Sequence, residues 1–343
     1  MLTVDGTEGG GQLLRTALSL STITDTPFRI EDIRGARPTP GLEPQHLAAV
    51  RTVADYCDAA VQGAELGADA LTFRPGEERR TSLDVDIGTA GSVTLLFDAV
   101  LPIAVTGDEP LTLTATGGTD VKWAPTVDYH RLVKLPLLAD CGVEAAIDLT
   151  RTGFYPAGGG EATLRAAPSS LSPLALDRRG ELERVEIHSK AAESLADREV
   201  ADRQAESARE ELAAAGLPAE VRRAEYVETA SPGSSLLLRG VYEAGVVGVD
   251  ALGERGRSSE AVAEGAVREF GAVHATDAAV DPFMADQLLV VLALAGGRVR
   301  IPSLTDHVRT NLNLLAQFGI DVDADGRADG TVLVEASAHP ALR

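Results

Sequence analysis

Residues 88–96 read GTAGSVTLL, a run of small and polar residues that leads directly into an apolar helix. Residues 9–14, GGGQLL, and residues 285–289, ADQLL, begin in the same way. After each opening come a short alternating strand, a turn and a second helix with apolar residues three and four apart. The strands are expected at residues 28–34, 111–116 and 299–301, and the second helices at residues 45–57, 124–142 and 306–319. The recurrence predicts three copies of a helix, strand, helix and strand unit.

The third copy is separated from the second by more than a hundred residues, far more than a single connection needs. This stretch has secondary structure of its own. We expect strands at residues 185–188, 221–227 and 235–241, and helices at residues 194–215 and 258–270. The sequence therefore predicts a small inserted α+β domain over residues 180–270, and a main domain over residues 1–179 and 271–343.

The composition is that of a globular protein. The chain has 343 residues, 44% of them hydrophobic, enough for one large core or two moderate ones. Cys57 and Cys141 are too few for a disulfide framework, and we expect both to be buried packing residues. No apolar run approaches the ~20 residues that span a bilayer, and the first residues are polar and glycine-rich. We expect a cytoplasmic protein with no signal peptide and no membrane partner.

The charge balance is strongly acidic, with 52 acidic against 31 basic residues, and only Lys122, Lys134 and Lys190 are lysines. Such acidity normally opposes nucleic-acid binding, because positive patches bind phosphates. The same composition is typical of a protein kept in solution in molar salt, where a Debye length of ~3 Å screens repulsion between acidic side chains. We favour this second interpretation, under which only local arginine clusters are informative about the partner.

The N-terminal segment, residues 5–12, is rich in glycine and opens a helix. Consecutive glycines before a helix allow backbone amides to approach an anion, and the helix dipole favours phosphate there. A tight turn between strand and helix would explain the same glycines. Glu8 favours the binding hypothesis, because a carboxylate beside a phosphate is a candidate ligand for Mg²⁺ or Mn²⁺.

Residues 34–42, RGARPTPGL, place Arg34 and Arg37 on a loop stiffened by two prolines. The helix that follows carries Gln45 and His46. Arginine suits bidentate recognition of phosphate, and a rigid loop lowers the entropy cost of holding it. In so acidic a chain an uncompensated arginine pair points to an anionic ligand, with surface ion pairs as the alternative. Arg15, one turn into the first helix, is expected to join them.

His307 lies at the start of a predicted helix, within residues 303–311, SLTDHVRTN. A histidine in this position is often only a neighbour of the helix cap. Neutral imidazole is also a competent nucleophile near neutral pH, with an unperturbed pKa of ~6.5. The six histidines show no spacing typical of a zinc site.

The segment from Phe283 to Gln287 offers an aromatic ring, a carboxylate and an amide within about one turn. These groups would suit a nucleotide, with Phe283 stacking on the base and Asp286 near metal or ribose. An acid placed in a first helical turn for its favourable interaction with the dipole is the alternative. From the residues alone, the chain is predicted to be a phosphate-handling enzyme.

Taken together, these motifs resemble those of the RNA 3'-terminal phosphate cyclases, in order and across nearly the whole chain. The resemblance is carried by residues 8–12 with Arg15, residues 34–42 with Gln45 and His46, residues 88–92, residues 117–120 (GGTD), residues 153–160 (GFYPAGGG), Asp286 with Gln287, and residues 307–311. It implies an α+β fold with three repeated units, each of two helices packed on a four-stranded sheet, plus a smaller inserted domain.

The resemblance also implies the reaction. ATP would adenylate a histidine and release pyrophosphate, and the AMP would pass to an RNA 3'-phosphate. The adjacent 2'-hydroxyl would then close a 2',3'-cyclic phosphate and release AMP. Adenylation supplies a leaving group that a phosphomonoester lacks, and the proximity of the hydroxyl makes the last step easy.

Carried over by position, His307 falls on the adenylated histidine and Glu8 on a metal-binding glutamate. Residues expected around the RNA end are Arg15, Arg34, Arg37, Gln45 and His46. Residues expected around ATP are Asp98, Phe283, Met284, Ala285, Asp286 and Gln287. Two positions depart from the family pattern, which often has glutamine at Asp98 and tyrosine at Phe283. Asp98 adds negative charge near ATP, and Phe283 keeps a stacking face without the hydroxyl.

Three alternatives compete with this hypothesis. A non-catalytic branch with the same fold lacks the nucleophilic histidine, which this chain has. An enolpyruvyl transferase, built from related repeats, lacks both that histidine and the GFYP phrase. A protein that binds RNA ends without turnover differs only in that it would not become labelled by ATP. The sequence leaves the oligomeric state open.

Overall fold

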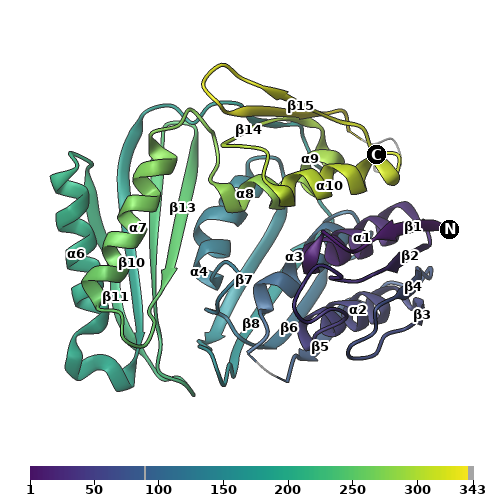
Figure 1. The fold of residues 1–343 in the computed structure, drawn as a ribbon, viewed down its shortest axis with the longest axis horizontal. Coiled ribbons are helices and arrows are strands. Elements are labelled where there is room, and N and C mark those ends of the chain that lie inside the picture. The colour runs from purple at the N-terminus through teal and green to yellow at the C-terminus, as the bar shows by residue number, and fades with distance from the viewer. Residues whose placement is uncertain (89, 339–343) are drawn as a thin grey trace.

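The computed structural model describes residues 1–88 and 90–338, and these residues form four mixed four-stranded sheets with helices packed on them (Figure 1). The sheets have the strand orders β1-β2-β4-β3, β5-β6-β8-β7, β9-β14-β16-β15 and β11-β10-β12-β13. This mixed architecture is compatible with the predicted α+β class.

The first sheet contains the N-terminal strands and carries two helices. Its strands are β1 Leu2–Asp5, β2 Phe28–Glu31, β3 Ala60–Gln62 and β4 Leu71–Arg74, and its helices are α1 Gly10–Thr24 and α2 Pro44–Cys57. β2 ends at Glu31, three residues before the predicted end, because Asp32 and Arg34 adopt left-handed backbone with φ of 51° and 57°. Such backbone cannot continue a strand.

The second sheet repeats the strand order of the first. Its strands are β5 Ser82–Asp86, β6 Leu111–Gly117, β7 Glu144–Arg151 and β8 Gly160–Ala167. Its first helix is α3 Val93–Val105, whose start is capped by Ser92 through a bond from the Leu95 amide. The second helix runs as α4 Val127–Tyr129, a π-helical turn His130–Lys134 and α5 Leu135–Ala139.

The third sheet combines residues distant in sequence. Its strands are β9 Leu174–Leu176, β14 Gly297–Ile301, β15 Val322–Gly326 and β16 Val332–Ala336, and its helices are α8 Pro282–Gln287, α9 Leu289–Ala295 and α10 Asp306–Gln317. In each of these three sheets, the first two strands run parallel and the last two complete the sheet by antiparallel pairing.

The fourth sheet comes from the chain between β9 and α8 and stands to one side of the other three (Figure 1). Its strands are β10 Leu182–Ala192, β11 Ala219–Val227, β12 Ser234–Tyr242 and β13 Gly245–Leu252, and its helices are α6 Val200–Ala214 and α7 Ser259–His274. The predicted helix over residues 194–215 is in fact a 3-10 segment, Glu193–Arg198, followed by α6. Glu199 separates the two with left-handed backbone, φ 51°.

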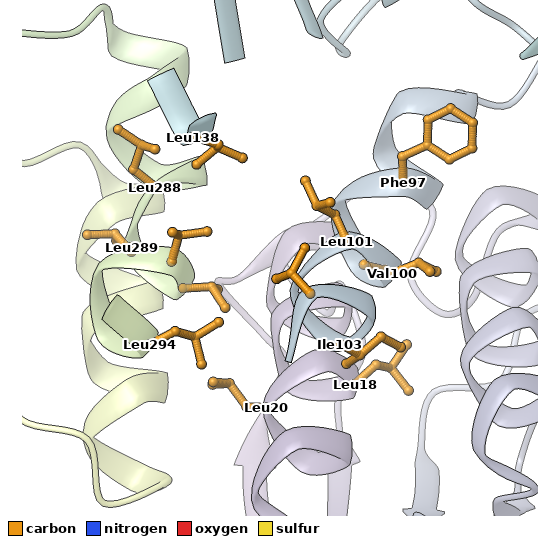
Figure 2. Packing of buried hydrophobic residues seen from close by; sticks show 14 of the residues in the cluster. Leu18, Leu20, Phe97, Val100, Leu101, Ile103, Leu138, Leu288, Leu289 and Leu294 are labelled. Atoms are coloured by element: carbon orange, nitrogen blue, oxygen red, sulfur yellow. The ribbon is translucent and has the colours of Figure 1, made fainter. Parts of the chain in front are cut away.

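The described residues form three groups of buried apolar side chains. One large core joins the three similar sheets and includes Leu237 and Val246 of the fourth, and a smaller core lies between the β10–β13 sheet and its helices. A third, small group consists of Tyr242, Val247 and Val273. Figure 2 shows side chains of α1, α3 and the α8–α9 segment meeting in the large core, with Leu20, Ile103 and Leu294 among them. Cys57 and Cys141 are buried free thiols in the same core, as predicted. The packing brings helices from the three similar sheets together, because α1 contacts both α3 and α10.

Candidate active site

A polar pocket opens where α1, α3, the π-helical turn, the α8–α9 segment and α10 meet. Its polar lining consists of Gln12, Arg15, Thr16, Ser19, Asp98, Lys134, Asp286, Gln287 and Asn311. Four residues that the sequence assigned to two different ligands, Arg15, Asp98, Asp286 and Gln287, thus share one cavity. A pocket with convergent charges and apolar walls is a good candidate for a binding site.

His307 lies in the first turn of α10, beside this pocket. Thr305 caps the helix through a bond from the Val308 amide, so His307 is not itself the cap. Its Nδ1 is 4.0 Å from Oδ2 of Asp286, and its side chain is 57% exposed. Partial burial lowers the pKa of His307 most, and the positive charges of Arg37 and Arg15 lower it further. The imidazole is therefore neutral and accessible near neutral pH.

Gln12 joins the glycine-rich segment to this histidine. Its Nε2 donates to the backbone oxygen of His307 at 3.1 Å and to Oγ1 of Thr310 at 3.2 Å. These bonds fix the start of α10 against α1. Asn311, one turn after His307, is 3% exposed, and its Oδ1 has no hydrogen-bond partner within the described residues. A buried amide without a partner in a pocket wall is a group that a ligand or water would satisfy.

His46 packs against the glycine-rich segment. A Cβ added at Gly11 would lie 2.1 Å from Nε2 of His46, so any larger residue there would force His46 to move. The His46 Nδ1 accepts a bond from the Glu43 amide at 3.2 Å. Burial lowers the pKa of His46 to about 3, with help from Arg15 and Arg34, so this histidine is neutral. Gln45 precedes it on α2 and is half-buried.

The two loop arginines differ in their surroundings. Arg34 donates to the Gly41 oxygen at 2.9 Å and to Oε1 of Glu43 at 2.7 Å. The expectation of an uncompensated pair is therefore wrong for Arg34, because Glu43, outside the quoted loop, neutralises it. Arg37 is exposed, with its Nη2 3.3 Å from the position of a Cβ on Gly10. Its backbone amide donates to the Arg34 oxygen at 2.9 Å, but its guanidinium makes no hydrogen bond or ion pair in the described part of the chain.

The segment from Phe283 to Gln287 divides between core and pocket. Met284 and Ala285 are buried in the large core, so their side chains do not face the cavity. Phe283 is 40% exposed and makes an edge contact with Tyr129 at 6.5 Å between ring centroids. The acid at the start of α8 is Asp281, which accepts bonds from the Phe283 and Met284 amides. Interaction with the helix dipole thus accounts for Asp281 and not for Asp286.

Asp286 faces the pocket as a carboxyl group with an altered pKa. Burial raises its pKa to about 6, and the charge of Asp98 adds to the effect, whereas Lys134 and Arg15 oppose it. The side chain of Asp286 is 17% exposed. An acid that changes charge just below neutral pH, 4.0 Å from a histidine, is a combination typical of catalytic sites.

Asp98 is held by two basic residues that the sequence did not assign. Lys134 Nζ lies 2.5 Å and His130 Nε2 lies 2.7 Å from the same carboxylate oxygen. Lys134 also donates to Oε1 of Gln287 at 2.9 Å. The sequence did offer a signal for this contact. Asp98 and Lys134 are charged residues within largely apolar stretches, and a buried charge needs a partner.

Glu8 is exposed on the loop before α1 and makes no hydrogen bond or ion pair within the described residues. Within residues 1–88 and 90–338, His, Cys, Asp and Glu residues form no group of three or more that could hold a metal ion. Mg²⁺ is commonly bound by one or two carboxylates together with substrate phosphates, which a single free glutamate can fit. Thr89, in the GTAGS motif, lies outside the described residues.

The model of the family RNA 3'-terminal phosphate cyclase matches residues 6–323, nearly the whole chain. The chain belongs to this family. A cyclase of that name from Halobacterium salinarum is 45% identical over 98% of this chain and 100% of its own length. Cyclases from Pyrobaculum aerophilum and Saccharolobus islandicus are 41% and 40% identical, over 92% and 95% of this chain and 92% and 97% of theirs.

The family predicted from the motifs is thus confirmed, and with it the prediction of an enzyme of this family. A solved structure of the enolpyruvyl transferase NikO from Streptomyces tendae is 17% identical over 47% of this chain and 31% of its own, with a TM-score of 0.26. That likeness is too low to support a conclusion.

No helix in the described residues is long and apolar enough to cross a membrane.

Proposed function

We propose that this cyclase family member converts an RNA 3'-terminal phosphate into a 2',3'-cyclic phosphate, using ATP and passing AMP through His307. The observation that carries the proposal is the neutral His307 imidazole, 4.0 Å from Asp286 and beside the pocket that Asp286 and Arg15 line. A neutral imidazole has the lone pair that nucleophilic attack requires.

In the first step, His307 attacks the α-phosphorus of ATP, a nitrogen–phosphorus bond forms and pyrophosphate leaves. Asp286 lies nearer to Nδ1, at 4.0 Å, and its carboxylate favours a proton on that nitrogen. The lone pair is then on Nε2, which is the proposed nucleophile. The amides at the start of α10 and the Arg15 guanidinium favour the negative charge of the phosphates.

In the second step, an oxygen of the RNA 3'-phosphate attacks the phosphorus of the AMP and releases His307. In the third step, the neighbouring 2'-hydroxyl attacks the RNA phosphorus, the cyclic phosphodiester forms, and AMP leaves with the electrons of the broken bond. The RNA end is proposed to lie near Arg15, Arg37, Gln45 and His46. Arg34 would act by holding the loop through Glu43.

ATP is proposed to lie against Phe283, Asp286, Gln287 and Asp98, with Met284 and Ala285 able to contribute only backbone atoms because their side chains are buried. A divalent ion, Mg²⁺ or Mn²⁺, would be held by Glu8 and substrate phosphates. When bound, it would spread the charge that develops on the phosphate oxygens.

We also propose that the main domain, residues 1–179 and 271–343, consists of three repeated units and that residues 180–270 are an inserted domain. The shared strand order of three sheets and the separate core of the fourth support this division. An RNA substrate favours the cytoplasm as the location. The acidic composition, with a relative from Halobacterium salinarum, supports function in high salt.

The test of the proposed reaction uses an RNA oligonucleotide with a labelled 3'-phosphate, incubated with protein, ATP and Mg²⁺ in molar KCl. We expect the label to become resistant to phosphatase. A matched oligonucleotide with a 2'-deoxy terminal nucleotide lacks the final nucleophile, so it should accumulate an adenylated 3' end. If the label stays fully sensitive to phosphatase in both RNAs, the protein binds RNA ends without turnover.

The pH dependence of AMP transfer follows from the lowered pKa of His307. Below that pKa the imidazole is protonated and has no lone pair, so the labelling rate should rise with pH, with its midpoint below the ordinary histidine value of ~6.5. Arg37→Gln removes a positive charge that disfavours the imidazolium, so its midpoint should move to higher pH. Arg29→Gln, at a surface pair with Glu31, is the matched control. An unchanged or lower midpoint in Arg37→Gln would contradict the assignment.

A further inference from the structure

The chain has three lysines, and two of them are buried. Lys134 and Lys190 are 4% and 1% exposed, whereas Lys122 pairs with Glu254 at the surface. Arginine supplies nearly all other positive charge in this protein. Lysine differs from arginine in presenting a compact ammonium that can be enclosed by a few acceptors. Lys134 is the one of the three that lines the pocket beside His307.

The backbone around Lys134 directs two basic side chains at one acid. His130–Lys134 forms a π-helical turn between α4 and α5, a feature that occurs frequently at functional sites. From this turn, Lys134 Nζ and His130 Nε2 reach Oδ1 of Asp98 on α3, at 2.5 and 2.7 Å. Asp98 is only 14% exposed. The result is a buried cluster of one acid and two basic groups in the pocket wall.

This cluster keeps the charge of Asp98 balanced. Burial alone would raise the pKa of Asp98, but Lys134 and then His130 outweigh it and hold the pKa well below its usual range. Asp98 is therefore an anion in a pocket that is proposed to receive phosphates. Without the ammonium, its charge would repel them at short range through a medium of low dielectric.

Lys134 also determines how Gln287 presents its amide. An ammonium has donors but no acceptor, so the Gln287 atom that faces Lys134 at 2.9 Å is the oxygen. The amide nitrogen is then directed elsewhere, and it makes no hydrogen bond within the described part of the chain. Gln287 lines the pocket, so this nitrogen is available to donate to an oxygen of a ligand.

We propose that Lys134 is a positioning residue for the nucleotide: it neutralises Asp98 and orients Gln287 as a hydrogen-bond donor into the pocket. This inference rests on the proposed function, because it takes the ligand of the pocket to be ATP. It also accounts for an acid at position 98, since Asp98 and Lys134 together present no net charge to the nucleotide.

The experiment compares wild type, Lys134→Met, the double variant Asp98→Asn/Lys134→Met, and the matched surface control Lys122→Met. Equilibrium binding of a non-hydrolysable ATP analogue and labelling by α-labelled ATP over a range of concentrations are measured in the same KCl buffer. Lys134→Met should weaken analogue binding about ten- to a hundred-fold and raise the ATP concentration for half-maximal labelling in parallel, with a smaller effect on the maximal rate. Lys122→Met should match wild type.

The double variant separates charge from loss of structure. Removing both charges leaves no unpaired buried ion, so it should fold and bind the analogue more tightly than Lys134→Met but less tightly than wild type, because Gln287 still lacks the donor that orients it. Wild-type affinity in Lys134→Met would overturn the inference, and so would a folded double variant that binds as weakly as Lys134→Met. If wild type binds the analogue without becoming labelled, the proposed function fails, and the binding data still decide on Lys134. If wild type neither binds nor becomes labelled, both fail.

Discussion

His307→Ala is expected to lose ATP-dependent conversion of an RNA 3'-phosphate by a factor of about 10⁴ or more, because removing a nucleophile removes the covalent step. The same variant should still cyclise an RNA supplied with an already adenylated 3' end. The last step uses the 2'-hydroxyl of the RNA as nucleophile and AMP as leaving group, and it depends mainly on positioning. The measurement is the rate of cyclic phosphate formation from each RNA.

His274→Gln is the matched control for this prediction, because His274 lies on α7 and contacts Tyr242, away from the pocket lining. It should convert both RNAs at wild-type rates. Retained conversion of the 3'-phosphate by His307→Ala would exclude His307 as the carrier of AMP. Loss of both reactions in a folded variant would show that His307 acts in binding the RNA and not only in transfer.

Lys190→Met is expected to lower the apparent free energy of unfolding by about 3–5 kcal/mol, the usual cost of removing one partner from a buried ion pair. Lys190 on β10 is 1% exposed, and its Nζ lies 3.1 Å from Asp120 and 3.2 Å from Asp128. Arg223 also contacts Asp128. Without the ammonium, Asp120 would be left as a buried charge with no cation beside it.

Denaturant unfolding in one fixed KCl concentration measures this effect. Lys122→Met is again the control, because its pair with Glu254 is about half exposed on both sides and such pairs contribute about 0–1 kcal/mol. Equal stability of Lys190→Met and Lys122→Met would show that the Asp120–Asp128–Lys190 cluster does not stabilise the contact between β10 and the segment that carries Asp120 and Asp128.

Helices and strands whose apolar residues recur at a regular spacing could be predicted from the sequence. The strand at residues 111–116 and the helix at residues 306–319 correspond to β6 and α10 within two residues at each end. β13, Gly245–Leu252, was missed because its glycines interrupt the alternation and only the turn from β12 makes it a strand. The break at Glu199 was also missed, because nothing in an otherwise helical stretch indicates left-handed backbone there.

The candidate site was predictable where its residues belong to local motifs. Arg15, Asp286 and His307 each begin or follow a recognisable helix start, and the structure places all three around one pocket. The partner of Asp98 was not predictable, since Lys134 lies 36 positions away and reaches it through a π-helical turn. The spacing of apolar residues in the sequence does not indicate a π-helical turn.

In the proposed reaction, AMP is carried on His307. Wild-type protein incubated with α-labelled ATP and Mg²⁺ in molar KCl, denatured and digested, should give one labelled peptide that tandem mass spectrometry assigns to His307, with a bond that acid cleaves and alkali does not. His307→Ala should give no labelled peptide. Label on a lysine or on any residue other than His307, or equal labelling of the two proteins, would contradict the claim.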